Sequence, residues 1–141
     1  MIKEIEVLNN LIFKPLKLNI TEIIPDLECE DYFGFNFKIN ETRIKFRKSK
    51  LTPKKVGQFV TFWKRDSEGK TVPFDINDDF DFYIISIEEN ENSGVFIFPK
   101  WILEKENFIS SELKVGKRGF RIYANWHFPN SKQAEKTKLW Q

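Results

Sequence analysis

The sequence has few of the residue types on which common active sites are built. Its 141 residues include one cysteine, Cys29, and one histidine, His127. A lone cysteine excludes an intramolecular disulfide and a multi-cysteine zinc site. A nucleophilic triad would have to use His127, and Cys29 lies in an acidic segment with no nearby cation to favour its thiolate. We therefore expect His127 at the surface or in a turn, and no enzyme is indicated.

Motifs for phosphate binding, membrane insertion and secretion are also missing. There is no G-x-G-x-x-G pattern and no phosphate-binding loop. The longest mainly apolar stretch, "FYIISI", has six residues and is too short to cross a bilayer. The first residues contain interspersed acids and no cleavable small-residue site, which is unlike a signal peptide. These absences predict a cytoplasmic protein with no membrane partner and no cofactor.

Aromatic residues, in contrast, are abundant. Fifteen phenylalanines and four tryptophans supply enough apolar surface for a well-packed core, which excludes a disordered chain. A chain of this length can bury a core of its own. Residues 1–141 are therefore predicted to form a single domain, while the oligomeric state is left open.

The net charge of +2 hides an uneven distribution along the chain. Residues 1–40 sum to −3 and residues 41–70 to +7. Residues 71–99, with seven acids and no cation, sum to −7, and residues 100–141 sum to +5. All five arginines lie in the two basic blocks. Two basic blocks separated by an acidic one are typical of a protein that binds a polyanion.

The spacing of the apolar residues predicts helices at both ends and strands between them. Residues 2–13 have helical periodicity, and residues 19–31 are expected to form a short helix or loop. Alternation with a period of two then predicts six strands, at 32–39, 42–47, 57–65, 80–87, 95–98 and 120–126. Two further helices are expected, one starting at Pro99 and one over residues 131–140 with Asn130 or Ser131 as its cap. The predicted fold is α+β, with a mainly antiparallel, barrel-like sheet and flanking N- and C-terminal helices.

The acidic run "DINDDFDF" leaves one enzymatic alternative open. Asp78, Asp79 and Asp81 offer the clustered oxygens that Mg²⁺ prefers, as in a metal-dependent nuclease. Only Asp79 and Asp81 share a strand face, and no lysine occurs between Lys70 and Lys100 to complete such a site. A solvated loop that leads into a strand is the simpler interpretation, so no metal and no catalytic residue is assigned.

The segment "LTPKKVGQFVTFWKR" combines cations with aromatic residues. Alternation places Phe59, Thr61, Trp63 and Arg65 on one strand face, and Gln58, Val60, Phe62 and Lys64 on the other. Both faces carry large apolar side chains, so the side that is buried stays open at this point. If the Trp63 face is exposed, it presents a stacking ring beside a guanidinium, which suits bases and phosphates.

A second segment, "GKRGFRIYANW", repeats this combination. Lys117 and Arg118 lie in a turn bounded by glycines, and Arg121 and Tyr123 share a strand face behind it. Lysines in such loops neutralise phosphates and give a salt-sensitive affinity without reading base sequence. A solvated charged surface remains the alternative for each lysine alone, but the repetition favours contact with an anion.

Four segments together resemble the MepB family, small bacterial proteins named from an operon with a multidrug efflux pump. They are "RKSKLTPKKVGQFVTFWKR", "GVFIFPK", "GKRGFRIYANW" and "NSKQAEKTKLWQ", and the resemblance runs from Tyr32 onward. Two features depart from it: His127 stands where an acid is more frequent, and members usually continue for a few aromatic residues beyond "WQ".

The resemblance implies a fold similar to the β-pseudobarrel DNA-reading domains of certain restriction enzymes and plant transcription factors, and DNA binding without catalysis. The positions it carries over as DNA contacts are Arg47, Lys50, Lys55, Trp63, Lys64, Arg65, Lys117, Arg118 and Arg121.

The residue patterns and the family resemblance together support one predicted function, with two alternatives. We predict that the protein binds single- or double-stranded DNA through a basic face built from residues 43–65 and 117–126. The lysines would contact phosphates, and Arg65, Arg118 and Arg121 would reach bases or grooves beside Trp63. The alternatives are the nuclease at Asp78, Asp79 and Asp81, and a protein–protein interaction module with an acidic partner.

Overall fold

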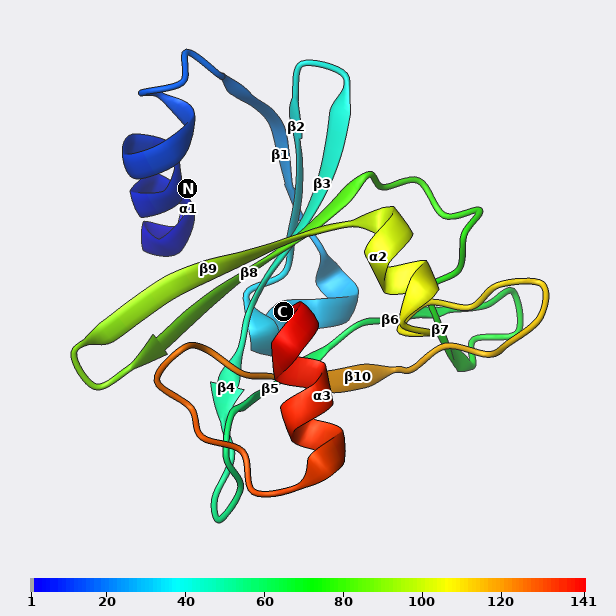
Figure 1. Ribbon diagram of the computed structural model, residues 1–141. Coiled ribbons are helices and arrows are strands. Elements are labelled where there is room, and N and C mark those ends of the chain that lie inside the picture. Colours follow the sequence, from blue (N-terminus) through cyan, green and yellow to red (C-terminus); the bar gives the residue numbers. More distant parts are fainter. Residues whose placement is uncertain (1) are drawn as a thin grey trace.

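Three β-sheets form the framework of the protein in a computed structural model that describes residues 2–141 (Figure 1). The largest sheet has five strands in the order β1-β2-β3-β8-β9. Their bounds are Ile20–Pro25 for β1, Phe35–Ile39 for β2, Thr42–Lys48 for β3, Phe82–Glu89 for β8 and Asn92–Pro99 for β9. All neighbours in this sheet are antiparallel except β3 and β8, which run parallel.

Two smaller sheets come from the segments that the sequence marks as basic. Strand β5 lies between β10 and β4 in a three-stranded antiparallel sheet, and β6 pairs with β7. Their bounds are Lys50–Leu51 for β4, Gln58–Thr61 for β5, Trp63–Arg65 for β6, Thr71–Pro73 for β7 and Gly119–Ile122 for β10. The connection between the parallel strands β3 and β8 thus contains β4, β5, β6 and β7.

Helices lie at both ends of the chain and beside the sheets. Helix α1, Lys3–Leu8, continues as the π-helical turn η1, Asn9–Phe13, and a 3₁₀ segment, η2, covers Leu27–Tyr32. Helix α2, Lys100–Lys105, follows β9, and helix α3, Lys132–Trp140, ends beside β10. The Ser131 side chain accepts a hydrogen bond from the Ala134 N–H, which confirms Ser131 as the cap of α3.

The five-stranded sheet separates two apolar clusters. On one face, Ile5 and Leu8 of α1 pack with Phe37, Ile44 and Phe46 of β2 and β3. On the other face, alternate residues of β8 pack against the inward side of β5 and β10. Strand β8 contributes buried side chains to both clusters, as the nearly continuous apolar run at its centre predicts.

Several predicted elements need correction. Residues 20–25 form strand β1 rather than a helix or loop, because they pair with the outer edge of β2. The strand predicted over 57–65 is interrupted at Phe62, where the chain leaves the sheet of β10 and joins that of β7. The Phe62 ring stacks on Tyr83 with centroids 4.0 Å apart. The five-stranded sheet is open, with β1 and β9 at its edges.

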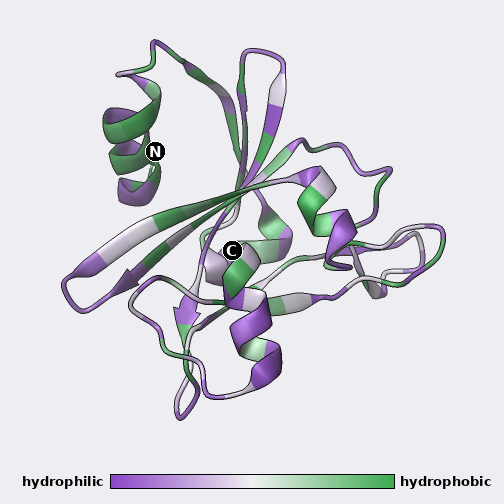
Figure 2. Ribbon diagram, in the orientation of Figure 1, coloured by the Kyte–Doolittle hydropathy of each residue, from purple (hydrophilic) through white to green (hydrophobic). Residues whose placement is uncertain are grey.

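The α+β class and the mainly antiparallel pairing are confirmed, as are the hairpin of β2 and β3 and the helices at both ends. None of the helices within residues 2–141 combines the length and the apolar character needed to span a membrane. The N-terminal part of α3 is mostly hydrophilic (Figure 2), and it borders the candidate site together with β4.

Candidate nucleic-acid interface

A cation, an aromatic ring and a second cation lie in one row across the three-stranded sheet. Lys50 of β4 pairs with Phe59 of β5, which pairs in turn with Arg121 of β10. Directly paired residues on neighbouring strands project to the same side. Because Val60 and Phe62 are fully buried, this row lies on the outward side of the sheet.

Gly119, which has no side chain, allows the Phe59 ring to lie close to the neighbouring strand β10. A methyl group on Gly119 would come within 2.5 Å of Phe59 Cζ and 3.1 Å of the Val60 carbonyl oxygen. The Phe59 ring therefore extends over Gly119 of the neighbouring strand. Lys50 points to a second ring, with its Nζ 4.7 Å from the centroid of Tyr32.

Arg121 is fixed by neutral partners. Its Nε and Nη2 donate to the Val56 carbonyl at 3.0 and 2.9 Å, and Nη2 also donates to the Gly57 carbonyl at 2.9 Å. Gly57 has a φ of +83°, and a side chain there would meet the Tyr123 ring at 2.7 Å. Carbonyl oxygens hold the guanidinium in place without cancelling its charge, so Arg121 keeps a full positive charge for an anion.

The loops next to this row add four more exposed cations. Lys54 and Lys55 lie in the turn between β4 and β5, and Lys117 and Arg118 immediately precede β10. The structure describes no ion pair for any of these four, for Lys50 or for Arg121 within residues 2–141. We call the following set the basic face: Lys50, Lys54, Lys55, Phe59, Lys117, Arg118 and Arg121.

Trp63 and Arg65 lie elsewhere, although alternation places them with Phe59. Buried Val60 and Phe62 resolve which side of β5 enters the core, and Trp63 is on the outer side. However, Trp63 lines a hollow with the η2 residues Glu28, Glu30 and Asp31. The Arg65 guanidinium packs on Trp63 at 5.3 Å from the ring centroid, and its backbone N–H donates to Glu28. The carboxylates repel phosphates, so we remove this pair from the predicted contacts.

Lys64 is also excluded as a DNA contact, because its ammonium group is paired with two carboxylates. Its Nζ lies 2.7 Å from Asp78 Oδ1 and 3.0 Å from Asp75 Oδ2. Partial burial opposes the charge of Lys64, but the hydrogen bonds to Asp78 and Asp75 outweigh burial and raise its pKa. This ammonium therefore neutralises the acidic loop instead of facing a ligand.

Arg47 was expected to contact DNA, and its position excludes direct contact. Its side chain is fully buried, with Nη1 donating to the Phe46 carbonyl and Nη2 to Asp26 at 2.5 Å. A buried guanidinium requires such partners to offset its lost hydration. Arg47 is thus a structural residue that joins β3 to the segment before η2.

In the folded protein, the acids of the nuclease alternative are paired with cations. A nuclease of this kind needs a lysine beside its acids, and the fold brings Lys64 and Lys100 to Asp78. These contacts are ion pairs and hydrogen bonds, and Asp79 and Asp81 are paired in the same way with Arg43. Across residues 2–141, no three His, Cys, Asp or Glu side chains come together where they could hold a metal ion.

His127 follows a turn, as expected, but is buried rather than at the surface. Its Nδ1 accepts a hydrogen bond from the Ala124 N–H, so the neutral ring carries its proton on Nε2, which lies 2.8 Å from Glu89 Oε1. That hydrogen bond lowers the pKa of Glu89. The pair connects the segment after β10 to the end of β8.

Comparison with known proteins identifies the family. Residues 26–141 match a family model described as MepB-like. The chain belongs to the MepB-like family. The resemblance drawn from its four sequence segments is thereby confirmed. A search of curated proteins finds no match.

A solved structure extends the likeness to nearly the whole MepB-like chain. The crystal structure of MepB superposes with a TM-score of 0.85 at 27% sequence identity, covering 99% of this chain and 93% of that one. The family match begins at residue 26 and therefore includes all of the basic face, whereas α1 and β1 both lie before it.

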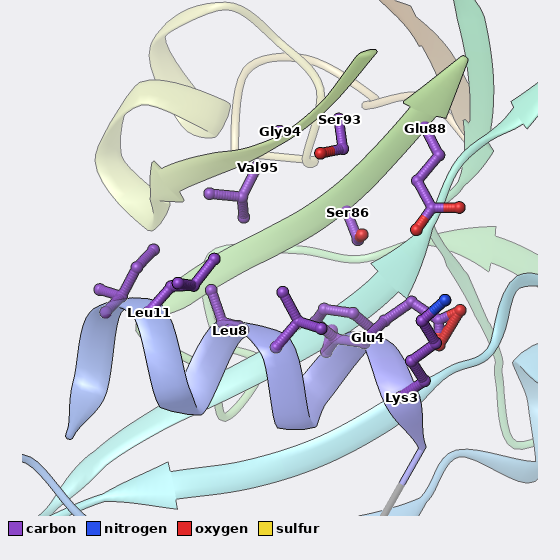
Figure 3. A pocket seen from close by; sticks show the side chains of 12 residues that line it. Lys3, Glu4, Leu8, Leu11, Ser86, Glu88, Ser93, Gly94 and Val95 are labelled. Carbon is purple, nitrogen blue, oxygen red and sulfur yellow. The ribbon is translucent and has the colours of Figure 1, made fainter. Parts of the chain in front are cut away.

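Another hollow, of about 190 Å³, lies on the opposite side of the five-stranded sheet from the basic face. In Figure 3, Leu8 of α1 and Leu11 of η1 face Val95 and Gly94 of β9 across it, with Glu4 and Glu88 at one end. Its lining is mainly apolar, and its acids outnumber its one lysine. It therefore lacks the charge that would attract DNA and is separate from the basic face.

Proposed function

We propose that this MepB-like protein binds DNA, single- or double-stranded, through the basic face and without catalysis. The observation that carries the proposal is the set of six cations around Phe59 for which the structure describes no carboxylate partner. A polyanion gains affinity by replacing the counterions of such charges. The exposed lysines would contact phosphates, and Arg118 and Arg121 would provide guanidinium groups that can reach phosphates or bases.

The spatial sorting of charge also supports this proposal. Arg43, Lys48 and Lys64 lie outside the face, and each is within 3.4 Å of a carboxylate. The basic face takes three of its six cations from each of the two basic sequence blocks. We further propose that the curled sheets serve as the pseudobarrel-like platform that the resemblance implies, and that the protein acts in the cytoplasm.

A salt-dependent titration tests the proposal. Single-stranded and duplex oligonucleotides are titrated at two salt concentrations against the wild type, Lys54→Gln/Lys55→Gln and Lys117→Gln/Arg118→Gln. We expect each double variant to bind more weakly, and the slope of log K against log salt to fall by up to about two units. Lys14→Gln/Lys17→Gln is the matched control, because it removes the same charge from the turn after η1, far from β4 in Figure 1.

Other outcomes assign a different function. Equal losses in the control and in the basic-face variants would mean that only net charge matters, which contradicts a defined face. Absence of DNA affinity in every condition would favour a protein–protein module. Mg²⁺-dependent cleavage that is abolished by changing Asp78, Asp79 and Asp81 to alanine would establish the nuclease instead.

A further inference from the structure

We infer that the hollow between β10 and α3 is a pocket for one nucleotide, with the base stacked on Phe59 and the phosphate at Lys117 and Arg121. The inference rests on the proposed function and specifies where a single nucleotide of the bound strand is held. The hollow has a volume of about 300 Å³, at the lower end of the range for ligand pockets. Its principal lining residues are Phe59, Lys117, Gly119, Arg121, Gln133 and Thr137.

One wall of the pocket is an aromatic ring beside a free cation. Phe59 extends over Gly119, where no side chain lifts it from the sheet. A base that stacks on such a ring gains apolar contact whatever its identity. Arg121 is the direct cross-strand neighbour of Phe59, so a phosphate attached to the stacked nucleotide can reach the guanidinium.

A second cation stands at the rim of the same pocket. Lys117 is exposed, and its Nζ lies 4.8 Å from the centroid of the Phe108 ring, which also lines the hollow. The ring keeps the ammonium at the rim without neutralising it. Lys117, just before β10, and Arg121, within β10, are each two residues from Gly119, the position that Phe59 covers.

The first turns of α3 form the opposite wall and add polar groups. The Ser131 hydroxyl is engaged with the Ala134 N–H, and Thr137 Oγ1 donates to the Gln133 carbonyl. The Gln133 side chain is exposed, and the structure describes no hydrogen bond from its amide to residues 2–141. A side-chain amide offers both a donor and an acceptor, which suits the edge of a nucleobase.

The decisive experiment combines variants of Phe59 with an abasic-site scan. Oligonucleotides with one abasic site at each successive position are titrated against the wild type, Phe59→Leu and Phe59→Tyr. We expect Phe59→Leu to weaken binding of the intact strand roughly 5- to 150-fold, as loss of one stacked base does. Phe59→Tyr keeps the ring and should bind like the wild type. The salt slope should stay unchanged in both, because no phosphate contact is removed.

The pocket specifically predicts that the affinity lost with one base depends on the presence of the Phe59 ring. At one position, the abasic site should weaken binding to the wild type and leave binding to Phe59→Leu unchanged. Gly119→Ala provides a second route, because its methyl group displaces the Phe59 ring while leaving the aromatic residue in the chain. It should reproduce the Phe59→Leu pattern, with thermal unfolding used to confirm that each variant is folded.

The outcomes separate this inference from the proposed function. One outcome is that DNA binds in a salt-sensitive way while every abasic site has the same effect on the wild type and on Phe59→Leu. That result would overturn the pocket and leave the proposal of DNA binding in place. If no oligonucleotide binds, titration with a mononucleotide decides: saturable binding that Phe59→Leu weakens supports a pocket for free nucleotides. Absence of binding by both ligands would overturn the pocket and DNA binding alike.

Discussion

Within the acidic run, the Asp81 carboxylate is held by Arg43 of β3. The carboxylate accepts hydrogen bonds from the backbone N–H of Arg43 at 2.8 Å and from Nε and Nη2 of the same residue at 3.3 Å. These hydrogen bonds lower the pKa of Asp81 and outweigh the opposing effect of partial burial. The acidic run is thus bonded to β3, although by sequence it resembles a solvated loop.

The lowered pKa of Asp81 predicts a pH dependence of stability. A carboxyl group with a depressed pKa stabilises the folded state above its unfolded pKa, about 3.9 for aspartate, and loses that contribution as the pH falls through its folded pKa. Asp81→Asn should therefore lower the Tm at pH 7 by roughly 2–4 °C, and the difference from wild type should shrink below about pH 4.

Thermal unfolding from pH 2.5 to 7 measures this effect. Asp79→Asn is the matched control, because its side chain is 90% exposed and, among residues 2–141, the structure describes one ion pair for it, with Arg43. A similar loss in both variants would contradict the role assigned to Asp81.

At the scale of elements, α3 completes the edge of β10 through one side chain. The Gln141 amide accepts a hydrogen bond from the Tyr123 N–H at 2.8 Å and donates to the Arg121 carbonyl at 3.1 Å. It thereby occupies the place of a neighbouring strand. This contact fixes α3 against β10 and keeps the two walls of the nucleotide pocket together.

Removing that amide should loosen the helix from the sheet. Gln141→Ala leaves the Tyr123 N–H and the Arg121 carbonyl unpaired, which costs about 1–3 kcal/mol of unfolding free energy. Chemical denaturation measures the loss. Gln133→Ala on the same helix should change stability by less than about 0.5 kcal/mol, because the structure describes no hydrogen bond from its side chain. Equal effects in the two variants would show that the amide contact contributes nothing.

Local patterns predicted the elements better than their pairing. Alternation correctly located the hairpin of β2 and β3, and β8 and β9, because it depends on residues close in sequence. Residue type likewise indicated Asn130 or Ser131 as the cap of α3, and the cap is Ser131. Strand β1 was missed, since its exposed positions at Thr21, Glu22 and Ile24 break the alternation. The parallel pairing of β3 with β8 joins distant segments and leaves no signal in either one.

The candidate site was predicted in part for the same reason. Lys50 and Arg121, identified from charge, do lie on one side of the small sheet, and Lys55, Lys117 and Arg118 lie in the loops next to it. Arg47 and Lys64 share that local composition, but they pair with carboxylates from other segments of the chain. The Arg65 guanidinium packs on Trp63, and only its backbone N–H contacts an acid, Glu28. Phe59 was placed on the correct strand face without being recognised, because its position over Gly119 depends on which strand lies beside β5.

At the scale of the whole molecule, folding pairs acidic and basic residues that lie in separate blocks along the chain. The unfolded chain has a basic block on each side of an acidic one, so opposite charges compete for any polyanion. In the folded protein, Lys64 and Arg43 pair with four of the seven acids of the acidic block. DNA is therefore expected to prefer the folded state strongly over the unfolded one.

This preference predicts that DNA stabilises the protein. At a free oligonucleotide concentration of about 100 times Kd, linkage gives about 2.7 kcal/mol of stabilisation, equivalent to a rise in Tm of roughly 8 °C. Differential scanning fluorimetry at low and high salt measures it, and the shift should diminish as salt weakens binding. Lys54→Gln/Lys55→Gln should show a smaller shift than Lys14→Gln/Lys17→Gln at the same concentrations. An undiminished shift in the first variant would contradict a contribution from the β4–β5 turn.

The parallel pairing of β3 and β8 has a consequence for the order of folding. Strands β4 to β7 all lie within the connection between these two central strands. A connection of this length closes late, because its ends must meet at an entropic cost before any contact compensates it. The basic face is built partly inside that connection and partly from β10, near the end of the chain. A nascent chain can therefore expose its first lysine-rich segment well before it can assemble the pocket at Phe59.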